Sequence, residues 1–162
     1  MSAAVRSSLP RAEAARLARA VLRAERVSHA ALSITFVGRR RIRDLNRTHL
    51  GHDRETDVIA LTLTDGAAHR PTPRNSGVRP PPPPATGRPG TGPVVGDVYV
   101  CVPVAVAQAR GYGASPREEL RRLAVHGVLH VLGWDHPDGP ARTRSPMWRR
   151  QEQLLARARR RR

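Results

Sequence analysis

The sequence predicts one domain of mixed α and β structure, built from three strands and four helices. Its 162 residues are typical of a single domain. Residues 11–26 show the apolar stripe of an amphipathic helix, residues 31–37 alternate apolar and polar side chains as a half-buried strand does, and residues 57–63 are almost wholly apolar and β-rich. Aromatic residues make up only 3% of the chain, so the core must consist mainly of Ala, Val, Leu and Ile.

The first helix, over residues 11–26, is expected to have a basic outer face, because its arginines fall largely outside the apolar stripe. These arginines are Arg11, Arg16, Arg19 and Arg23. Residues 31–37 are predicted to form the first strand and residues 39–49 a short helix. Residues 57–63 are predicted to form a buried central strand, and residues 97–102 a third strand.

A proline-rich segment separates the second and third predicted strands. Residues 65–93 hold nine of the fifteen prolines, including five in a row from Pro80 to Pro84. Such a segment can neither pack a core nor join a ladder of backbone hydrogen bonds. We expect a disordered or polyproline insertion within the domain, either simply tolerated or recruiting a partner through its prolines.

The third predicted helix carries the strongest local signals. Ser115 is expected to be the N-cap, with Pro116 at the first helical position and Glu118 completing a capping box. Gly133 is the expected stop. A last helix is predicted to start at Ser145-Pro146 and to end in a basic tail at about residues 157–162, either a solvated end or an arm that binds phosphates.

Composition and charge narrow the classes of function. The formal net charge of +16, carried by arginines, favours an anionic partner, either nucleic acid or an acidic membrane surface. The single cysteine, Cys101, cannot form an internal disulfide or a cysteine-based zinc site. No apolar run is long enough for a membrane span, and no secretory signal is apparent, so a cytoplasmic location is expected.

A cluster of histidines is the candidate site. His126 and His130 are four residues apart on the capped helix, which puts them roughly 40° apart around its axis and about 6 Å along it. A break at Gly133 would let the chain turn back and present His136. Three imidazole ligands suit a catalytic Zn²⁺ that keeps a fourth position for water. The pair is expected at the edge of the core, where a cleft could reach it.

Position 127 discriminates between kinds of hydrolase. Zinc peptidases of the H-E-x-x-H type place a glutamate base directly after the first histidine, whereas this chain has Gly127. The metal would then work mainly as a Lewis acid and water activator, and the basic surroundings favour a phosphodiester substrate. No catalytic side chain is assigned. Asp135 is expected either to accept the second ring N–H of a ligand histidine or to cap the turn.

These residues resemble the YbeY family of rRNA-maturation factors, which are metal-dependent endoribonucleases specific for single strands. The family pattern H-G-x-L-H-L-x-G-Y-D-H reads HGVLHVLGWDH over residues 126–136. Further family blocks appear as Leu45-Asn46, Thr56-Asp57-Val58 and Gly96-Asp97-Val98, and the resemblance covers roughly residues 15–157 outside the insert. It implies an α+β fold with a small mixed sheet packed by helices, and a zincin-like histidine helix that lines a cleft and binds one Zn²⁺.

The resemblance also has departures. Many members carry an arginine five residues after the leucine of the Leu-Asn pair, thought to hold or activate phosphate, and this chain has Leu50 there. Arg47 is the candidate to replace it in substrate binding. Ala60 stands where serine is common, and the connection before Gly96 is long, proline-rich and basic rather than short and acidic.

Three functions remain open from the sequence. The first, which the resemblance implies, is a zinc-dependent endoribonuclease acting in rRNA 3′-end maturation and ribosome quality control, with RNA and ribosomal particles as partners and neither DNA nor membrane. The second is a noncatalytic, zinc-stabilised assembly factor that binds rRNA. The third is a metallohydrolase for a peptide or small substrate, against which Gly127 argues.

Overall fold

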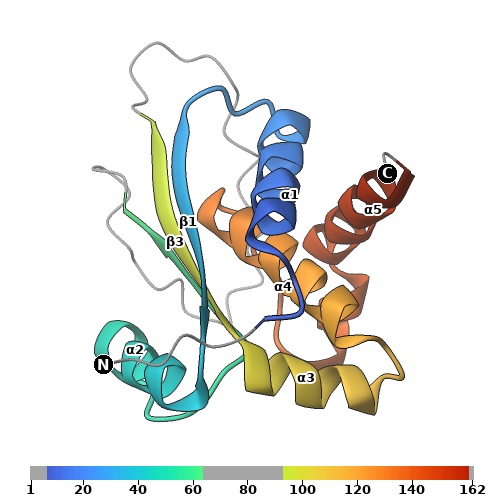
Figure 1. The fold of residues 1–162 in the computed structure, drawn as a ribbon. Coiled ribbons are helices and arrows are strands. Elements are labelled where there is room, and N and C mark those ends of the chain that lie inside the picture. The colour runs from blue at the N-terminus through green and yellow to red at the C-terminus, as the bar shows by residue number, and fades with distance from the viewer. Residues whose placement is uncertain (1–6, 64–92, 161–162) are drawn as a thin grey trace.

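The computed structural model describes residues 7–63 and 93–160, and Figure 1 shows their arrangement. Its helices and strands follow one another in the order α1 (Arg11–Ala24), β1 (Ala30–Val37), α2 (Arg39–Leu50), β2 (Val58–Thr62), β3 (Val94–Cys101), α3 (Val102–Gly111), α4 (Pro116–Val131), the 3₁₀-helix η1 (Gly139–Arg144) and α5 (Pro146–Arg160). This is the expected α+β class.

The described strands form one small mixed sheet in the order β1-β3-β2. β1 runs parallel to β3, with Ile34 opposite Val98, and β2 runs antiparallel to β3, with Ala60 opposite the same Val98. β3 is therefore the central strand. Alternate β3 residues point to opposite faces, which lets this strand serve two separate hydrophobic clusters.

The two faces of the sheet are covered by different helices. α1, α4 and α5 lie on one face, to the right of the strands in Figure 1, and pack with Val98 and Val100 of β3. α2 covers the other face, where Ile42 and Leu45 pack with Cys101 and with Ile59 and Leu61 of β2. α4 lies at the centre of the larger cluster, since every residue from Leu123 to Leu129 is buried.

The main differences from the predicted elements lie after β3. The helix α3 was not predicted, since the third predicted strand ended at residue 102 and no element was assigned to residues 103–114. Pro103 at the start of α3 is the signal that favours the helix. β3 begins earlier than the predicted strand over residues 97–102, and it ends one residue earlier because α3 begins at Val102. The proline-rich insert lies outside the described residues, apart from Pro93 at its end.

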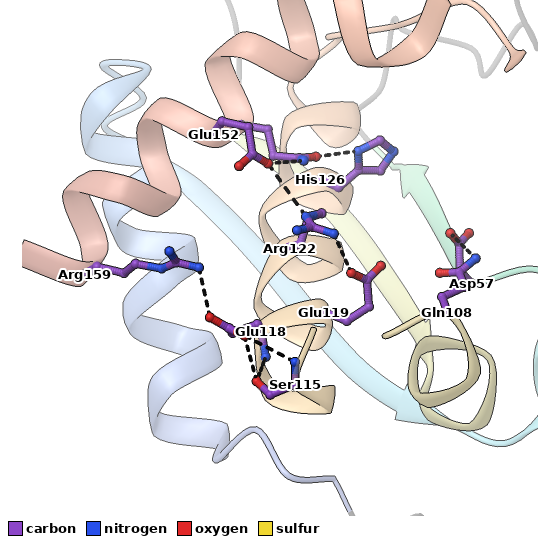
Figure 2. Close-up of polar contacts among 10 residues, drawn as sticks. Asp57, Gln108, Ser115, Glu118, Glu119, Arg122, His126, Glu152 and Arg159 are labelled. Atoms are coloured by element: carbon purple, nitrogen blue, oxygen red, sulfur yellow. Dashed lines mark hydrogen bonds and ion pairs between the residues drawn. The ribbon is translucent and has the colours of Figure 1, made fainter. Parts of the chain in front are cut away.

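The two ends of α4 are as predicted. The Ser115 hydroxyl accepts a hydrogen bond from the Glu118 N–H at 3.2 Å, and the Glu118 carboxylate accepts the Ser115 N–H at the same distance (Figure 2). The pKa of the Glu118 carboxyl group is lowered by the hydrogen bonds that it accepts from the Ser115 N–H and from the Ser115 hydroxyl. α5 continues as helix to Arg160, so the basic residues from Arg157 to Arg160 belong to it. Of the described helices, none combines the length and apolar character of a membrane span.

Candidate metal centre

The end of α4 sets the position of the third histidine, His136. Gly133 has a positive φ of 90°, and the N–H groups of Gly133 and Trp134 return to the carbonyls of His130 and Leu129, at 2.9 and 3.0 Å. This is a Schellman motif, which favours glycine because a side chain strains the left-handed backbone. The motif reverses the chain directly after α4, as predicted, and so brings His136 back toward the helix.

Three histidine side chains converge at this reversal. The Nε2 atom of His126 lies 3.0 Å from Nε2 of His130 and 3.2 Å from Nε2 of His136. The three potential ligand atoms all lie within 4.8 Å of one another. The structure therefore brings together the three histidines that the spacing singled out. His126 is buried, and the other two are half-buried.

The opposite ring nitrogen of each histidine faces an oxygen. Nδ1 of His126 lies 2.8 Å from Oε1 of Gln151, Nδ1 of His130 lies 2.9 Å from the Trp134 carbonyl, and Nδ1 of His136 lies 3.1 Å from the Pro137 carbonyl. Each neutral ring then carries its proton on Nδ1, where it donates to that oxygen. The three Nε2 atoms, which lie close together, then keep their lone pairs free for a cation.

This donor set fits a divalent cation. Three lone pairs at such short range repel one another unless something positive lies between them. In a tetrahedral zinc site with Zn–N distances of about 2.0–2.1 Å, ligand nitrogens lie about 3.3 Å apart, close to the observed separations of 3.0 and 3.2 Å. Oxygen acceptors on the far ring nitrogens are the usual partners of metal-bound imidazoles.

Burial keeps His126 in the form that can bind a metal. Loss of hydration is the largest cause that lowers the pKa of His126, followed by repulsion from His130, and together they bring it to about 3. The hydrogen bond with Gln151 acts in the opposite direction. His126 is therefore neutral at physiological pH, and a cation need not displace a proton from it.

The loop that carries His136 is tied to two helices. Glu25, at the end of α1, accepts a hydrogen bond from the indole Nε1 of Trp134 at 3.2 Å. The same carboxylate accepts Nε of Arg150 from α5 at 2.6 Å, and Arg150 also donates to the Ala24 carbonyl. Only 6% of the Glu25 side chain is exposed. This shielded pair holds the turn between His130 and His136 in place.

A polar chain supports His126 from α5. Gln151 is fully buried, and its amide nitrogen donates to Glu152 at 3.1 Å, which orients its oxygen toward His126. Nε of Arg122 lies 3.7 Å from the Glu152 carboxylate. Nη1 of Arg122 donates a hydrogen bond to the buried Glu119 carboxylate at 2.7 Å (Figure 2). Burial raises the pKa of Glu119. Gln151 was not predicted as a site residue, although its position as a polar residue on the apolar stripe of Met147 and Leu154 was a usable signal.

Gly127 lies against the sheet. A Cβ atom at this position would lie 2.3 Å from Cγ1 of Val98 on β3 and 3.3 Å from a methyl group of Val58 on β2. A glutamate at position 127 would therefore be forced into the sheet, not toward the histidines. The packing of α4 excludes the peptidase base on steric grounds, in addition to its absence from the sequence.

The remaining motif residues hold the scaffold. Asp135 accepts the backbone N–H of His136 at 2.8 Å, so the turn-capping alternative is the one observed. Asn46 is buried and donates to the Arg54 carbonyl at 2.8 Å, which closes the loop after α2. Asp57 accepts from the Val58 N–H and from Gln108 of α3, and Gly96 allows Val131 to approach β3 closely.

Arg47 and Leu50 lie on α2, which covers the other face of the sheet. The Arg47 guanidinium is exposed and lies 3.3 Å from Asp44. Leu50 packs against the smaller hydrophobic cluster. The structure therefore gives Arg47 an ion pair of its own rather than a contact with the histidines, and its role in substrate binding stays a prediction. His49 lies in the last turn of α2, within the helix predicted over residues 39–49.

Comparisons with known proteins place this geometry in a family. The family model Endoribonuclease YbeY matches residues 3–159. A protein of Moorella thermoacetica called Endoribonuclease YbeY is 39% identical over 142 residues, covering 87% of this chain and 81% of the relative. One of the same name from Geobacillus kaustophilus is 38% identical over 128 residues, covering 79% and 72%.

A solved structure shares the fold. The solution structure of a Thermotoga maritima protein superimposes with a TM-score of 0.54 at 20% identity, covering 91% of this chain and 79% of that one. The family match spans nearly the whole chain, including the helix, turn and loop that bring the three histidines together. The chain belongs to the YbeY family.

Proposed function

We propose that this chain is a zinc-dependent endoribonuclease that cuts single-stranded RNA during rRNA 3′-end maturation and ribosome quality control in the cytoplasm. His126, His130 and His136 would hold the ion. The observation that carries the proposal is the convergence of three Nε2 atoms whose rings are each oriented by an oxygen at Nδ1. The names of the family and of its relatives supply the reaction class.

The chain's own residues have definable tasks in this proposal. The three imidazoles offer neutral Nε2 donors, and Gln151 and two backbone carbonyls keep the rings in that tautomer. The bound cation would supply Lewis acidity at the phosphodiester and would lower the pKa of a water molecule. Because His136 comes from a loop and is half-buried, the donor set faces solvent on one side, where a substrate can approach.

Charge supports RNA as the substrate. The chain has 29 basic residues against 13 acidic ones. A polyanion is attracted to such a surface without regard to its sequence, and the attraction weakens as salt rises. Ribosomal particles fit this description as partners, and a cytoplasmic location follows from the proposed substrate. A peptide substrate receives no comparable support, since Gly127 leaves no room for the base.

The test compares histidine variants for metal content and RNA cleavage. His130→Ala is the main variant, because His130 is half-buried and its loss should disturb the core less than loss of His126. His49→Ala, an exposed histidine on α2, is the matched control. We expect the purified parent protein to contain zinc and to show chelator-sensitive cleavage of a single-stranded RNA. His130→Ala should lose both properties, and His49→Ala should keep both.

The same experiment separates the second candidate. Leu50, where many relatives have arginine, packs against apolar side chains and supplies no phosphate contact. This observation favours an assembly factor that binds rRNA without cutting it. Such a protein would contain zinc and bind RNA but would show no chelator-sensitive cleavage at any substrate length. Cleavage that persists undiminished in metal-free His130→Ala would refute the zinc mechanism itself.

A further inference from the structure

A groove of about 350 Å³ lies between α1, α4 and α5, apart from the histidine centre. Figure 1 shows these three helices side by side. Most of its lining comes from one side of α1, with Arg121 from α4 and Ala158 from α5. The arginines that line it are Arg16, Arg19, Arg23 and Arg121.

Among the residues that the structure describes, Glu13 is the one acidic residue that lines the groove, and its charge is already neutralised. Glu13 is 4% exposed, forms an ion pair with Arg117 and lies 3.3 Å from Nε of Arg121. These two arginines more than balance its charge. The buried Glu13 therefore does not make the groove repel an anion.

Three arginines on the rim have no acidic partner in the described structure. Arg16, Arg19 and Arg23 are exposed, and no carboxylate within residues 7–63 and 93–160 forms an ion pair with them. By contrast, Arg117 and Arg150 on the neighbouring helices are paired with Glu13 and Glu25. The rim thus concentrates unneutralised charge along one helix.

The groove and the metal centre occupy different sides of α4. Arg121 and His126 are five residues apart, which corresponds to about 140° around the helix axis. In Figure 2 the His126 ring points away from α1, toward the strands. A ligand in the groove would therefore not contact the histidines directly.

We propose that this arginine-lined groove is a second RNA-binding site, which holds the phosphate backbone of a segment distant from the bond that is cut. The proposal rests on RNA as the proposed substrate but not on the metal or on catalysis. Arg16 and Arg23 are seven residues apart, so they span about 10 Å along α1. That spacing lets the rim contact several successive phosphates, and the guanidinium fork suits phosphate oxygens.

The first test removes the charge of the rim and measures RNA binding by fluorescence anisotropy, with a chelator present so that no cleavage occurs. The variant is Arg16→Ala/Arg19→Ala/Arg23→Ala. A control with equal charge loss is Arg40→Ala/Arg41→Ala/Arg54→Ala, since these exposed arginines lie on or beside α2 and also form no ion pair within the described residues. Circular dichroism checks that both fold.

We expect the groove variant to bind a 40-nucleotide RNA about 10- to 100-fold more weakly near 0.1 M salt. The slope of the logarithm of the binding constant against the logarithm of the salt concentration should be shallower by roughly two. The fold loss of affinity in the control variant should be less than a tenth of the loss in the groove variant. Equal losses in the two variants would show that only net charge matters and would overturn the proposal. An effect seen only with anionic phospholipid vesicles, and not with RNA, would overturn it in favour of a membrane.

A second variant keeps every charge and obstructs the groove. Ala20→Leu/Ala158→Leu adds bulk at two lining positions. We expect it to weaken binding of the same RNA at least fivefold while the protein remains folded. Wild-type affinity in this variant would contradict a ligand seated in the groove. Neither outcome depends on cleavage, so a failure of this proposal is distinguishable from a failure of the proposed nuclease activity.

Discussion

Replacing Gly127 with alanine tests whether close contact between α4 and the sheet, rather than chemistry, dictates the residue after the first histidine. The added Cβ would lie 2.3 Å from Cγ1 of Val98, roughly 1 Å short of ordinary van der Waals contact, which begins near 3.4 Å. Val98 is fully buried, and its β-branched side chain has little freedom at χ1. The clash can be relieved only if α4 and β3 move apart.

The expected magnitude combines two opposing effects. Overpacking a tight core by one carbon costs up to about 3 kcal/mol, which fits an overlap of this size. Replacing a helical glycine with alanine stabilises the folded protein by about 1 kcal/mol. We therefore expect Gly127→Ala to lower the free energy of unfolding by about 2 kcal/mol.

Urea unfolding followed by circular dichroism, with a chelator present, measures this cost. Gly111→Ala is the matched control, because a Cβ at position 111 in α3 would meet open space. That variant should be neutral or slightly stabilised. Most of the cost of Gly127→Ala should disappear in a Val98→Ala background, because Cγ1 and Cγ2 of Val98, at 2.3 and 3.2 Å from the added Cβ, are both absent there.

The reasoning is refuted if Gly127→Ala is as stable as the parent protein. It is also refuted if its cost is the same with valine and with alanine at position 98. Either result would mean that the packing between α4 and the sheet can accommodate an added methyl group at position 127.

Two further predictions concern the histidine centre. Gln151→Leu removes the oxygen that orients His126, so affinity for Zn²⁺ measured by competition with a chromophoric chelator should fall about 10- to 100-fold, whereas Gln151→Glu should keep the acceptor and most of the affinity. Unchanged affinity in Gln151→Leu would contradict the assigned role. Metal-free protein should lose stability as pH falls from about 6.5 toward about 3, because the unfolded chain binds a proton at His126 that the folded chain, with a pKa of about 3, excludes. Urea midpoints at pH 7.5, 6 and 5 measure this, and a slope as steep in His126→Gln would show that other groups cause it.

Local features were predictable from the sequence. The capping box at Ser115 and the stop at Gly133 depend on neighbours within a few residues, and both are present. The spacing of His126 and His130 follows from the helical repeat alone. The helix α3 was not predicted, although Pro103 near its start is a local signal that favours a helix.

Partners distant in the sequence were decided only by tertiary structure. The acceptor for His126 is 25 residues away on α5, and the carboxylate that holds Trp134 is 109 residues away on α1. The contact that requires glycine at position 127 comes from β3. The sequence by itself determined which three imidazoles could meet, because helix geometry and a glycine turn are properties of adjacent residues. Which side chains orient those rings and which residues exclude a glutamate base depend on how helices and strands pack, and no local pattern encodes that choice.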